Sequence, residues 1–447
     1  MAALRACLAD EAGAPAEWPL VPEHLQEAFV EFVVCQRVTW VIARCSGQLG
    51  LSAASAELLR DAAAADVQAA MRVQAVAAQV VGGLNGAGIR CLTYKGVALA
   101  LATTGDPSAR GASDVDLIMD PSDVPAAHDF LMDGGAEFVR GYCPSPADEL
   151  WDLARRVGCE APYRWRGVDI DLHWRFDRLP QIAAIPFDDL WEARTHASIA
   201  GLDLPTMGSV DALLLTCAHG TKEHWRHLRW VVDLVRQARD VHDWRQVLER
   251  SRETGCEESL AVGLAMAAHL AGGVSPLVPG PRPTRLADWA WADLMGDSAP
   301  FGRVAIGAQS ERLRWSWQTL PSRRAGGSML ARQALTTLDM AELPLPRSMA
   351  WAYPLVRPAL WARRLATGRY GAAALRDYIL VGGCTSPPLR MRAVGWGLAP
   401  SASVSGVTSG ALQSFVSSAM WGRYLPPLLE ARVGRRTRVR PVTREGR

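Results

Sequence analysis

The sequence predicts an α+β protein in which one small mixed β-sheet, with its own helices, is flanked by helical regions on both sides along the chain. Three observations carry this prediction. Residues 89–101 read as a short strand, a Lys-Gly turn and a helix; residues 114–119 form an Asp-x-Asp segment that runs into apolar residues; residues 168–174 alternate polar and apolar side chains. Long stretches with helical spacing precede and follow these segments, which is typical of α+β organisation.

The first 88 residues are expected to be an N-terminal helical region. Residues 1–22 are rich in proline and alanine and are expected to be loosely ordered. Residues 24–45 carry apolar side chains at helical spacing, and residues 53–84 are an alanine-rich helix that a group of glycines ends. These helices are expected to pack beside the sheet.

Residues 89–204 are expected to form the α/β core. Besides the three segments above, the core is expected to contain a helix over 123–132 capped by Ser122, a strand over 137–142, a helix over 150–156, a hairpin from 163–166 through Gly167 into 168–174, and a short helix over 187–194 before the segment 199–204. The strands of this region would carry the functional side chains.

The rest of the chain is expected to be a helical domain over 205–275 and a mostly helical extension over 276–447. The predicted helices span 210–220, 225–239, 244–252, 259–270, 286–295, 330–341 and 353–365. A proline-rich linker separates the two parts at 276–283. Residues 398–412 are rich in serine and glycine, and the arginines from Arg432 onward form a flexible basic tail.

The overall composition narrows the class of function. The formal charge of +2 over 447 residues gives no electrostatic case for a nucleic-acid partner. Nine cysteines without a Cys-x-x-Cys motif are expected to be free thiols in a reducing cytosol. The N-terminus lacks a secretory signal pattern, and no uninterrupted apolar run reaches about 18 residues, so we expect a cytoplasmic protein without a membrane partner.

The acidic side chains of two predicted strands point to a metal site. Asp114 and Asp116 are two residues apart, so on a strand both carboxylates lie on one side. Asp169, Asp171 and His173 share one face of the second strand in the same way. A hard cation such as Mg²⁺ prefers carboxylate oxygens and commonly brings substrate phosphates with it. An Asp-x-Asp pair alone is weak evidence, because solvated acidic pairs are common.

The Lys95-Gly96 turn is a candidate phosphate site. A glycine at the start of a helix lets backbone N–H groups approach a phosphate, and the helix dipole favours the anion. The chain has only two lysines, Lys95 and Lys222, and all its other basic residues are arginine. A lysine in this turn is therefore a departure from the composition.

These motifs together resemble a known family. Lys95-Gly96, Arg110-x-x-Ser113-Asp114-x-Asp116 and Asp171-Leu172-His173-Trp174 resemble the uncharacterised nucleotidyltransferase branch of the DNA polymerase beta-like nucleotidyltransferase superfamily. The resemblance continues through His219 and Arg229-Trp230-x-x-Asp233-Leu234 and covers roughly residues 20–280. The wider superfamily usually has Gly-Ser at the phosphate turn, so a lysine replaces a serine hydroxyl here.

The resemblance implies a metal-dependent transfer of an NMP group from an NTP to an acceptor, with release of pyrophosphate. The residues it implies are Asp114, Asp116 and Asp171 for catalysis and for Mg²⁺, and Lys95, Gly96, Arg110 and Ser113 for the nucleotide. Two metals bridged by carboxylates would stabilise the attacking and leaving oxygens. The partners would be an NTP, with ATP as the first candidate, and an unidentified acceptor (a natural product, peptide, sugar or protein) in a biosynthetic pathway.

Several alternatives remain open at this point. Asp169 rivals Asp171 as the third acid, Arg110 is as well suited to anchoring a loop as to binding phosphate, and Ser113 to capping a turn. His219, His224 and His227 invite a zinc site, although structural histidines are the better interpretation. A non-catalytic binding protein on the same fold and a tRNA-modifying toxin are the alternative functions, since fold does not fix function.

Overall fold

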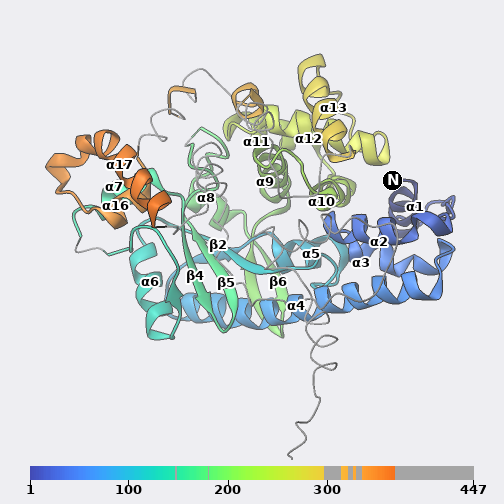
Figure 1. The fold of residues 1–447 in the computed structure, drawn as a ribbon, viewed down its shortest axis with the longest axis horizontal. Coiled ribbons are helices and arrows are strands. Elements are labelled where there is room, and N and C mark those ends of the chain that lie inside the picture. The colour runs from blue at the N-terminus through green and yellow to red at the C-terminus, as the bar shows by residue number, and fades with distance from the viewer. Residues whose placement is uncertain (146–147, 180, 296–313, 321–325, 329–334, 368–447) are drawn as a thin grey trace, which may run out of the picture.

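The computed structural model describes residues 1–145, 148–179, 181–295, 314–320, 326–328 and 335–367. Within these residues a seven-stranded sheet is enclosed by helices (Figure 1). The α+β fold class predicted from the sequence is confirmed. The predicted flexible segment 398–412 and the basic tail from Arg432 lie outside the described residues, as does part of the helix predicted over 330–341.

The N-terminal region is helical from its second residue. Its elements are α1 (Ala2–Glu11), the 3₁₀ turn η1 (Glu23–Leu25), α2 (Gln26–Cys35), α3 (Thr39–Arg44), the 3₁₀ turn η2 (Ser46–Gln48) and the long α4 (Ala53–Gly86). The expectation that residues 1–22 are loosely ordered is wrong for α1. Leu4 and Leu8 are buried, and the Arg5 Nε donates to the Leu270 carbonyl oxygen at 2.9 Å. Because the partner lies far along the chain, local composition does not reveal it.

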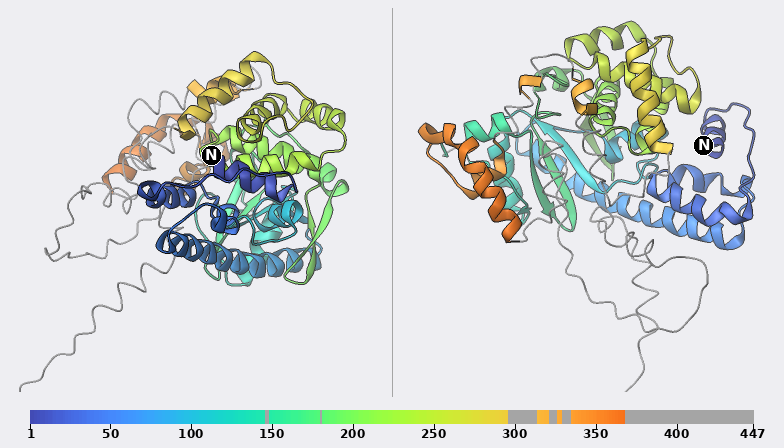
Figure 2. Two further views of the ribbon diagram at one scale, coloured as in Figure 1. Left: turned by 90° about the vertical axis from the view of Figure 1, so that its right-hand side faces the viewer. Right: turned by 45° about the horizontal axis from the view of Figure 1, so that its top comes forward.

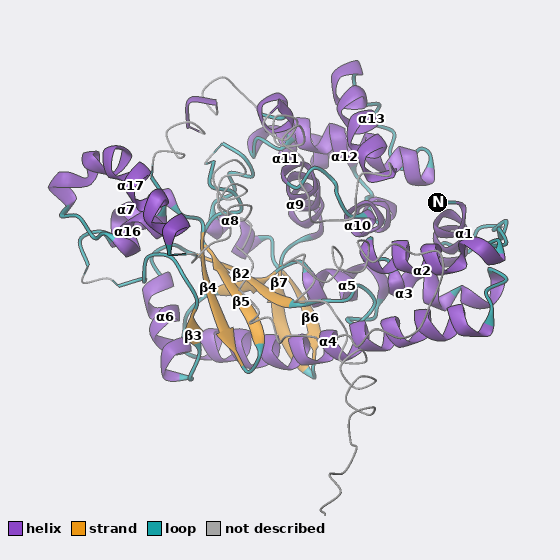
Figure 3. Ribbon diagram, in the orientation of Figure 1, coloured by secondary structure: helices purple, strands orange, loops and turns teal. Residues whose placement is uncertain are grey.

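The sheet is mixed, with strand order β3-β4-β5-β2-β1-β7-β6 (Figure 3). The strands are β1 (Cys91–Thr93), β2 (Asp114–Met119), β3 (Glu137–Phe138), β4 (Glu160–Trp165), β5 (Val168–His173), β6 (Thr195–Ile199) and β7 (Leu202–Thr206). The pairs β2–β5 and β1–β7 are parallel, and the other neighbours are antiparallel. The parallel β2–β5 pair lies near the middle of the sheet.

The two faces of the sheet belong to different hydrophobic cores. Val115 and Leu117 of β2 pack in the core that includes α4 and α6 (Val124–Asp133). Ile118 of β2 and Leu92 of β1 pack in the core of α9 (Ser209–Lys222) and the helices around it. The ribbon shows α4 along one side of the sheet and α9 on the other (Figure 1). We call the second side the α9 face.

The remaining helices surround this sheet. They are α5 (Gly96–Thr104), α7 (Trp151–Val157), α8 (Phe187–Glu192), α10 (Leu228–Arg239), α11 (Trp244–Glu253), α12 (Glu257–Ala271), α13 (Pro281–Met295), α16 (Thr337–Glu342), the 3₁₀ turn η3 (Arg347–Ala352) and α17 (Tyr353–Ala366). Two rotated views show α13 near α1 and the α16–α17 pair at the opposite end (Figure 2).

Several predicted boundaries differ from the structure. The helix predicted over 225–239 begins at Leu228, because His224 and Trp225 have positive φ angles of 58° and 51° that separate α9 from α10. Ser122 does not cap α6, because its hydroxyl bonds to the Asp120 carboxylate. The predicted strand 137–142 is reduced to the two residues of β3.

A buried ion-pair cluster joins α16 to α17. The Asp339 carboxylate accepts hydrogen bonds from Arg357 Nη1 at 2.6 Å and from Arg364 Nη2 at 2.7 Å. Arg364 Nε also donates to the Glu342 carboxylate at 3.1 Å. We call these four residues the α16–α17 charge cluster.

Candidate active site

The register of β2 and β5 places the predicted acids side by side. Asp114 is the Cα partner of Asp169, and Asp116 is the partner of Asp171. Since Val115 and Leu117 take the opposite face, these carboxylates lie on the α9 face. The two acidic runs, which are more than 50 residues apart in the sequence, therefore form one acidic surface.

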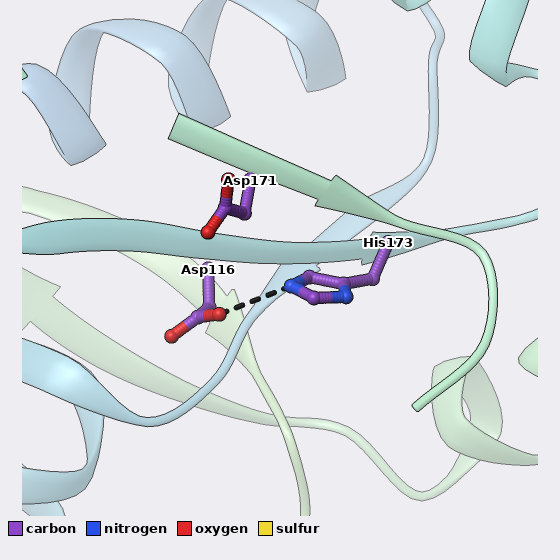
Figure 4. Close-up of side chains that lie close together, drawn as sticks. All are labelled: Asp116, Asp171 and His173. Atoms are coloured by element: carbon purple, nitrogen blue, oxygen red, sulfur yellow. Dashed lines mark hydrogen bonds and ion pairs between the residues drawn. The ribbon is translucent and has the colours of Figure 1, made fainter. Parts of the chain in front are cut away.

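Asp116, Asp171 and His173 form the centre of this surface. One donor atom from each lies within 4.8 Å of the other two. His173 Nε2 lies 3.1 Å from Asp116 Oδ1, and the close-up shows the Asp171 carboxylate next to this pair (Figure 4). In the described part of the chain, these are the residues with a geometry that could hold a metal ion.

Lys95 reaches this group from the turn before α5. Its Nζ lies 3.4 Å from Asp116 Oδ1, and its side chain is 22% exposed. Lys95 and Gly96 have φ angles of 57° and 43°, a left-handed conformation that costs free energy at a lysine. This conformation starts α5 at Gly96 and turns the lysine toward the acids. The ion pair is with Asp116, not with Asp114.

Glu160 and Arg140 extend the site beyond His173. Glu160 is the cross-strand partner of His173, and its Oε2 lies 3.5 Å from His173 Nδ1. Arg140 Nη2 lies 4.0 Å from the Glu160 carboxylate. Sequence analysis did not identify Glu160 as a site residue, because only the β4–β5 register brings it here. His173 did carry a signal, since it shares the alternating face of Asp169 and Asp171.

The two central carboxylates have opposite pKa shifts. Burial raises the pKa of Asp171 well above its usual value, and the nearby carboxylates of Glu160, Asp116 and Asp114 raise it further. Burial also acts to raise the pKa of Asp116, but Lys95 and the hydrogen bond from His173 outweigh it and lower that pKa below its usual range. Two acids with pKa values moved apart are typical of sites where one accepts a proton and the other stays charged.

The remaining predicted acids have partners of their own. Asp114 lies outside the central group and accepts a hydrogen bond from Ser113 Oγ at 3.2 Å. Asp169 accepts two hydrogen bonds from Arg164, at 2.7 and 2.9 Å. The Asp171 carboxylate makes no hydrogen bond or ion pair with a residue in the described ranges, although its backbone is paired on both sides in the sheet. Of the two rivals, Asp171 is therefore the one that faces Asp116 without a salt-bridge partner.

Arg110 is held away from the acids by α10. Its Nε donates to Asp233 Oδ2 at 2.7 Å, and both side chains are almost fully buried. Arg229, one turn earlier on α10, donates to the Gly111 carbonyl oxygen at 3.2 Å. These two contacts tie the loop between α5 and β2 to α10.

His219, His224 and His227 do not lie together as a set of metal ligands. His219, on α9, is near enough to Asp116 and Lys95 for their charges to act on its pKa; burial lowers this pKa well below the usual value, and Lys95 and Lys222 add to the effect. His224 packs against Trp315, with ring centroids 4.2 Å apart. Among the described residues, no zinc site of these histidines is present.

The central group fits a small oxygen-preferring cation. Ligands on opposite sides of Mg²⁺ are about 4.2 Å apart, since each lies about 2.1 Å from the ion. The observed limit of 4.8 Å is slightly larger, so a small inward rotation of side chains closes it. Asp171 offers a carboxylate without an ion-pair partner among the described residues, and Asp116 is held ionised. These two residues would hold the metal, and His173 would orient Asp116.

The comparison with protein-family models agrees with the resemblance seen in the sequence. No curated protein matches this chain. A solved structure of an antigenic nucleotidyltransferase-like protein from Paracoccidioides brasiliensis aligns with 14% sequence identity and a TM-score of 0.27, over 40% of this chain and 88% of that one. None of the described helices is long and apolar enough to cross a membrane. The model of the uncharacterised nucleotidyltransferase family matches residues 22–272, more than half of the chain, and the protein therefore belongs to this family.

Proposed function

We propose that this protein transfers an NMP group from an NTP to an acceptor hydroxyl or similar nucleophile, with Mg²⁺ bound by Asp116 and Asp171. One observation carries this proposal. The parallel β2–β5 pair puts Asp171, which lacks an ion-pair partner among the described residues, beside Asp116, whose pKa is lowered by Lys95 and by a hydrogen bond with His173. Family membership supplies the class of reaction.

We propose that two carboxylates, those of Asp116 and Asp171, hold the metal. Mg²⁺ supplies charge neutralisation and orientation for the triphosphate. Asp116 and Asp171 provide one carboxylate each, and Asp114, next to them on β2, is the candidate for a second ion. His173 Nε2 faces Asp116 Oδ1, and its Nδ1 lies 3.5 Å from Glu160 Oε2, so His173 would fix the direction of the Asp116 carboxylate.

The phosphates are proposed to bind where β1 turns into α5. The first N–H groups of α5 point out of the helix start at Gly96, where an anion is favoured. Lys95 is adjacent and would exchange its 3.4 Å contact with Asp116 for a phosphate oxygen once a metal neutralises Asp116. Ser113, immediately before β2, is a further candidate for binding phosphate. Arg110 is assigned to holding the loop rather than to contacting phosphate.

The transfer step forms one bond and breaks one. The acceptor oxygen bonds to the α-phosphorus, the bond from that phosphorus to the bridging oxygen breaks, and pyrophosphate leaves. Asp171 is proposed to help activate the acceptor hydroxyl, whose proton leaves to this carboxylate or to solvent. The acceptor stays open among a natural product, a peptide, a sugar and a protein, and ATP is the first nucleotide to test.

The experiment uses the full chain, Mg²⁺ and each NTP in turn, labelled at the α-phosphate. Candidate acceptors of the four classes are added, and pyrophosphate and labelled product are measured together. We expect label transfer with stoichiometric pyrophosphate, and loss of both when EDTA removes the metal. NTP binding without pyrophosphate release from any acceptor class would instead support a non-catalytic binding protein.

A further inference from the structure

The second lysine of the chain lies on the helix that faces the acidic group. Lys222 is the last residue of α9, one turn after His219. His219 is close enough to both Lys95 and Lys222 for each to lower its pKa. The only two lysines of the sequence therefore flank one histidine on the α9 face of the sheet.

A short series of contacts connects the two ammonium groups. Lys95 Nζ lies over the Tyr94 ring, 4.7 Å from its centroid. Tyr94 meets Phe176 edge-on at a centroid distance of 5.3 Å, and Asp177 follows Phe176 in the loop after β5. Lys222 Nζ lies 3.9 Å from Asp177 Oδ2. Both lysine side chains are 22% exposed, so neither is locked in the core.

The charges around the site are separated into two zones. Asp116 and Asp171 belong to the sheet, and His219 and Lys222 belong to α9. Lys95 lies at the border and contacts Asp116 at 3.4 Å. A triphosphate carries more negative charge than one divalent ion and one lysine neutralise, so a second cation beyond Lys95 would complete the balance. The 3.9 Å contact of Lys222 with Asp177 is long for a charge-assisted hydrogen bond and is readily exchanged.

We propose that Lys222 is a second phosphate-binding residue. Its ammonium group would exchange the contact with Asp177 for a contact with the terminal phosphates of the NTP, on the α9 side of the site. The proposal rests on the proposed function and names the part of the substrate that α9 would recognise. Asp177 holds the ammonium at the rim before the nucleotide arrives. His219 lies near both ammonium groups.

A structural role for Lys222 makes different predictions. A lysine in the last turn of a helix interacts favourably with the helix dipole, and an ion pair with Asp177 adds to this. In that case the replacement of either partner lowers the melting temperature and leaves nucleotide affinity unchanged. Under our proposal, the replacement of Lys222 weakens nucleotide binding and the replacement of Asp177 does not.

The test measures the affinity of the full chain for Mg·ATP and for AMP by calorimetry, together with melting temperatures without ligand. We expect Lys222→Met to weaken Mg·ATP binding by about 10- to 150-fold, because a charge-assisted bond contributes roughly 1.5–3 kcal/mol. AMP affinity is expected to be unchanged, because AMP lacks the terminal phosphates. Asp177→Asn is expected to bind Mg·ATP as tightly as the unmodified chain or more tightly.

Two further variants complete the design. Lys222→Gln is a second neutral replacement in case the methionine variant does not fold. Arg245→Met removes one positive charge from an exposed position on α11 and is expected to bind like the unmodified chain. Unchanged Mg·ATP affinity in either folded Lys222 variant, or weaker binding in Asp177→Asn, overturns the inference. If the unmodified chain binds no NTP at all, the proposed function fails as well, which is a separate result.

Discussion

Two groups of buried charges in this protein have opposite balances. In the α16–α17 charge cluster, Asp339 and Glu342 face two arginines, and the Asp339 carboxylate meets both of them at 2.6 and 2.7 Å. At the centre of the sheet, Asp116 contacts Lys95 and His173 at 3.4 and 3.1 Å. Asp171 beside it has no ion pair within the described residues. One group is closed and neutral, and the other has an excess of negative charge.

The difference separates a structural role from a functional one. A buried acid with a full set of basic partners is stable as it is, and nothing further is needed to hold it. A buried acid beside other acids costs free energy of folding, which the raised pKa of Asp171 reflects. Such a group is stabilised when a cation binds.

The largest effect is expected for Asp116→Asn. The variant loses the ionised carboxylate that would hold the metal, and a metal contributes several kcal/mol to such a transfer. We expect label transfer from NTP to fall by roughly three orders of magnitude or more, at about 1.4 kcal/mol per decade, while the chain still folds. Asp61→Asn, at an exposed position of α4, is the matched control. Full activity of the Asp116 variant with Mg²⁺ as the only metal would contradict the metal site.

Asp339→Asn is expected to have the largest effect on stability. The replacement leaves two buried arginines without their shared carboxylate, which typically costs about 3–5 kcal/mol. Urea unfolding and hydrogen exchange of α16 and α17 measure the loss. Asp188→Asn, whose exposed carboxylate pairs with Arg90, is expected to cost less than about 1 kcal/mol. Mg·ATP affinity should not change in either variant, and a large change in the Asp339 variant would show that the two charge groups are coupled.

Lys95→Met tests whether Lys95, which contacts Asp116, also binds the phosphates of the NTP. Loss of one charge-assisted bond of roughly 1.5–3 kcal/mol should weaken NTP binding by about 10- to 150-fold. Because Lys95 contacts Asp116, its removal should also strengthen Mg²⁺ binding in the absence of nucleotide. Titrations of Mg²⁺ alone and of Mg·ATP separate the two effects. If Lys95 only holds the turn, the melting temperature falls and the NTP affinity of the folded variant is unchanged.

The sequence predicted which acids share a strand face, because that depends only on short-range patterns. The period of two in Asp114-x-Asp116 and Asp169-x-Asp171 fixes which side chains share a face, whatever lies beside the strand. The fold class follows from the same local patterns, since the strands that carry the acids and the helix over 53–84 have their own signal. The family resemblance is confirmed by the match over residues 22–272.

The parts that the sequence did not predict depend on partners that are distant in the chain. Glu160 reaches His173 only through the β4–β5 register. The family pattern favours Asp171 over Asp169, but the contact of Arg164 with Asp169 cannot be read from the sequence. Arg110 finds Asp233 on α10, 123 residues later. No local pattern contains this information, and so the sequence left these alternatives open.

The smallest effect, and the most direct test of the contrast, is expected for Asp171→Asn in the absence of metal. Its folded pKa is raised, so the folded state holds its proton more tightly than the unfolded state and stability falls as pH rises above about 3.9. At pH 7 the amide removes this cost, and we expect the free energy of unfolding to rise. The gain should become smaller toward pH 4, where the unfolded chain also begins to hold the proton.

Mg²⁺ should reverse the order of the two proteins. In the unmodified chain, a saturating concentration of the ion raises the melting temperature, because it binds only the folded state. In Asp171→Asn the ion has one carboxylate fewer and should change the melting temperature little. Without Mg²⁺ the Asp171 variant should therefore melt at the higher temperature, and with Mg²⁺ the unmodified chain should. Asp61→Asn should behave like the unmodified chain in both conditions. A variant that is less stable than the unmodified chain without metal would mean that Asp171 is a satisfied structural acid, as Asp339 is, and the contrast between the two groups would no longer hold.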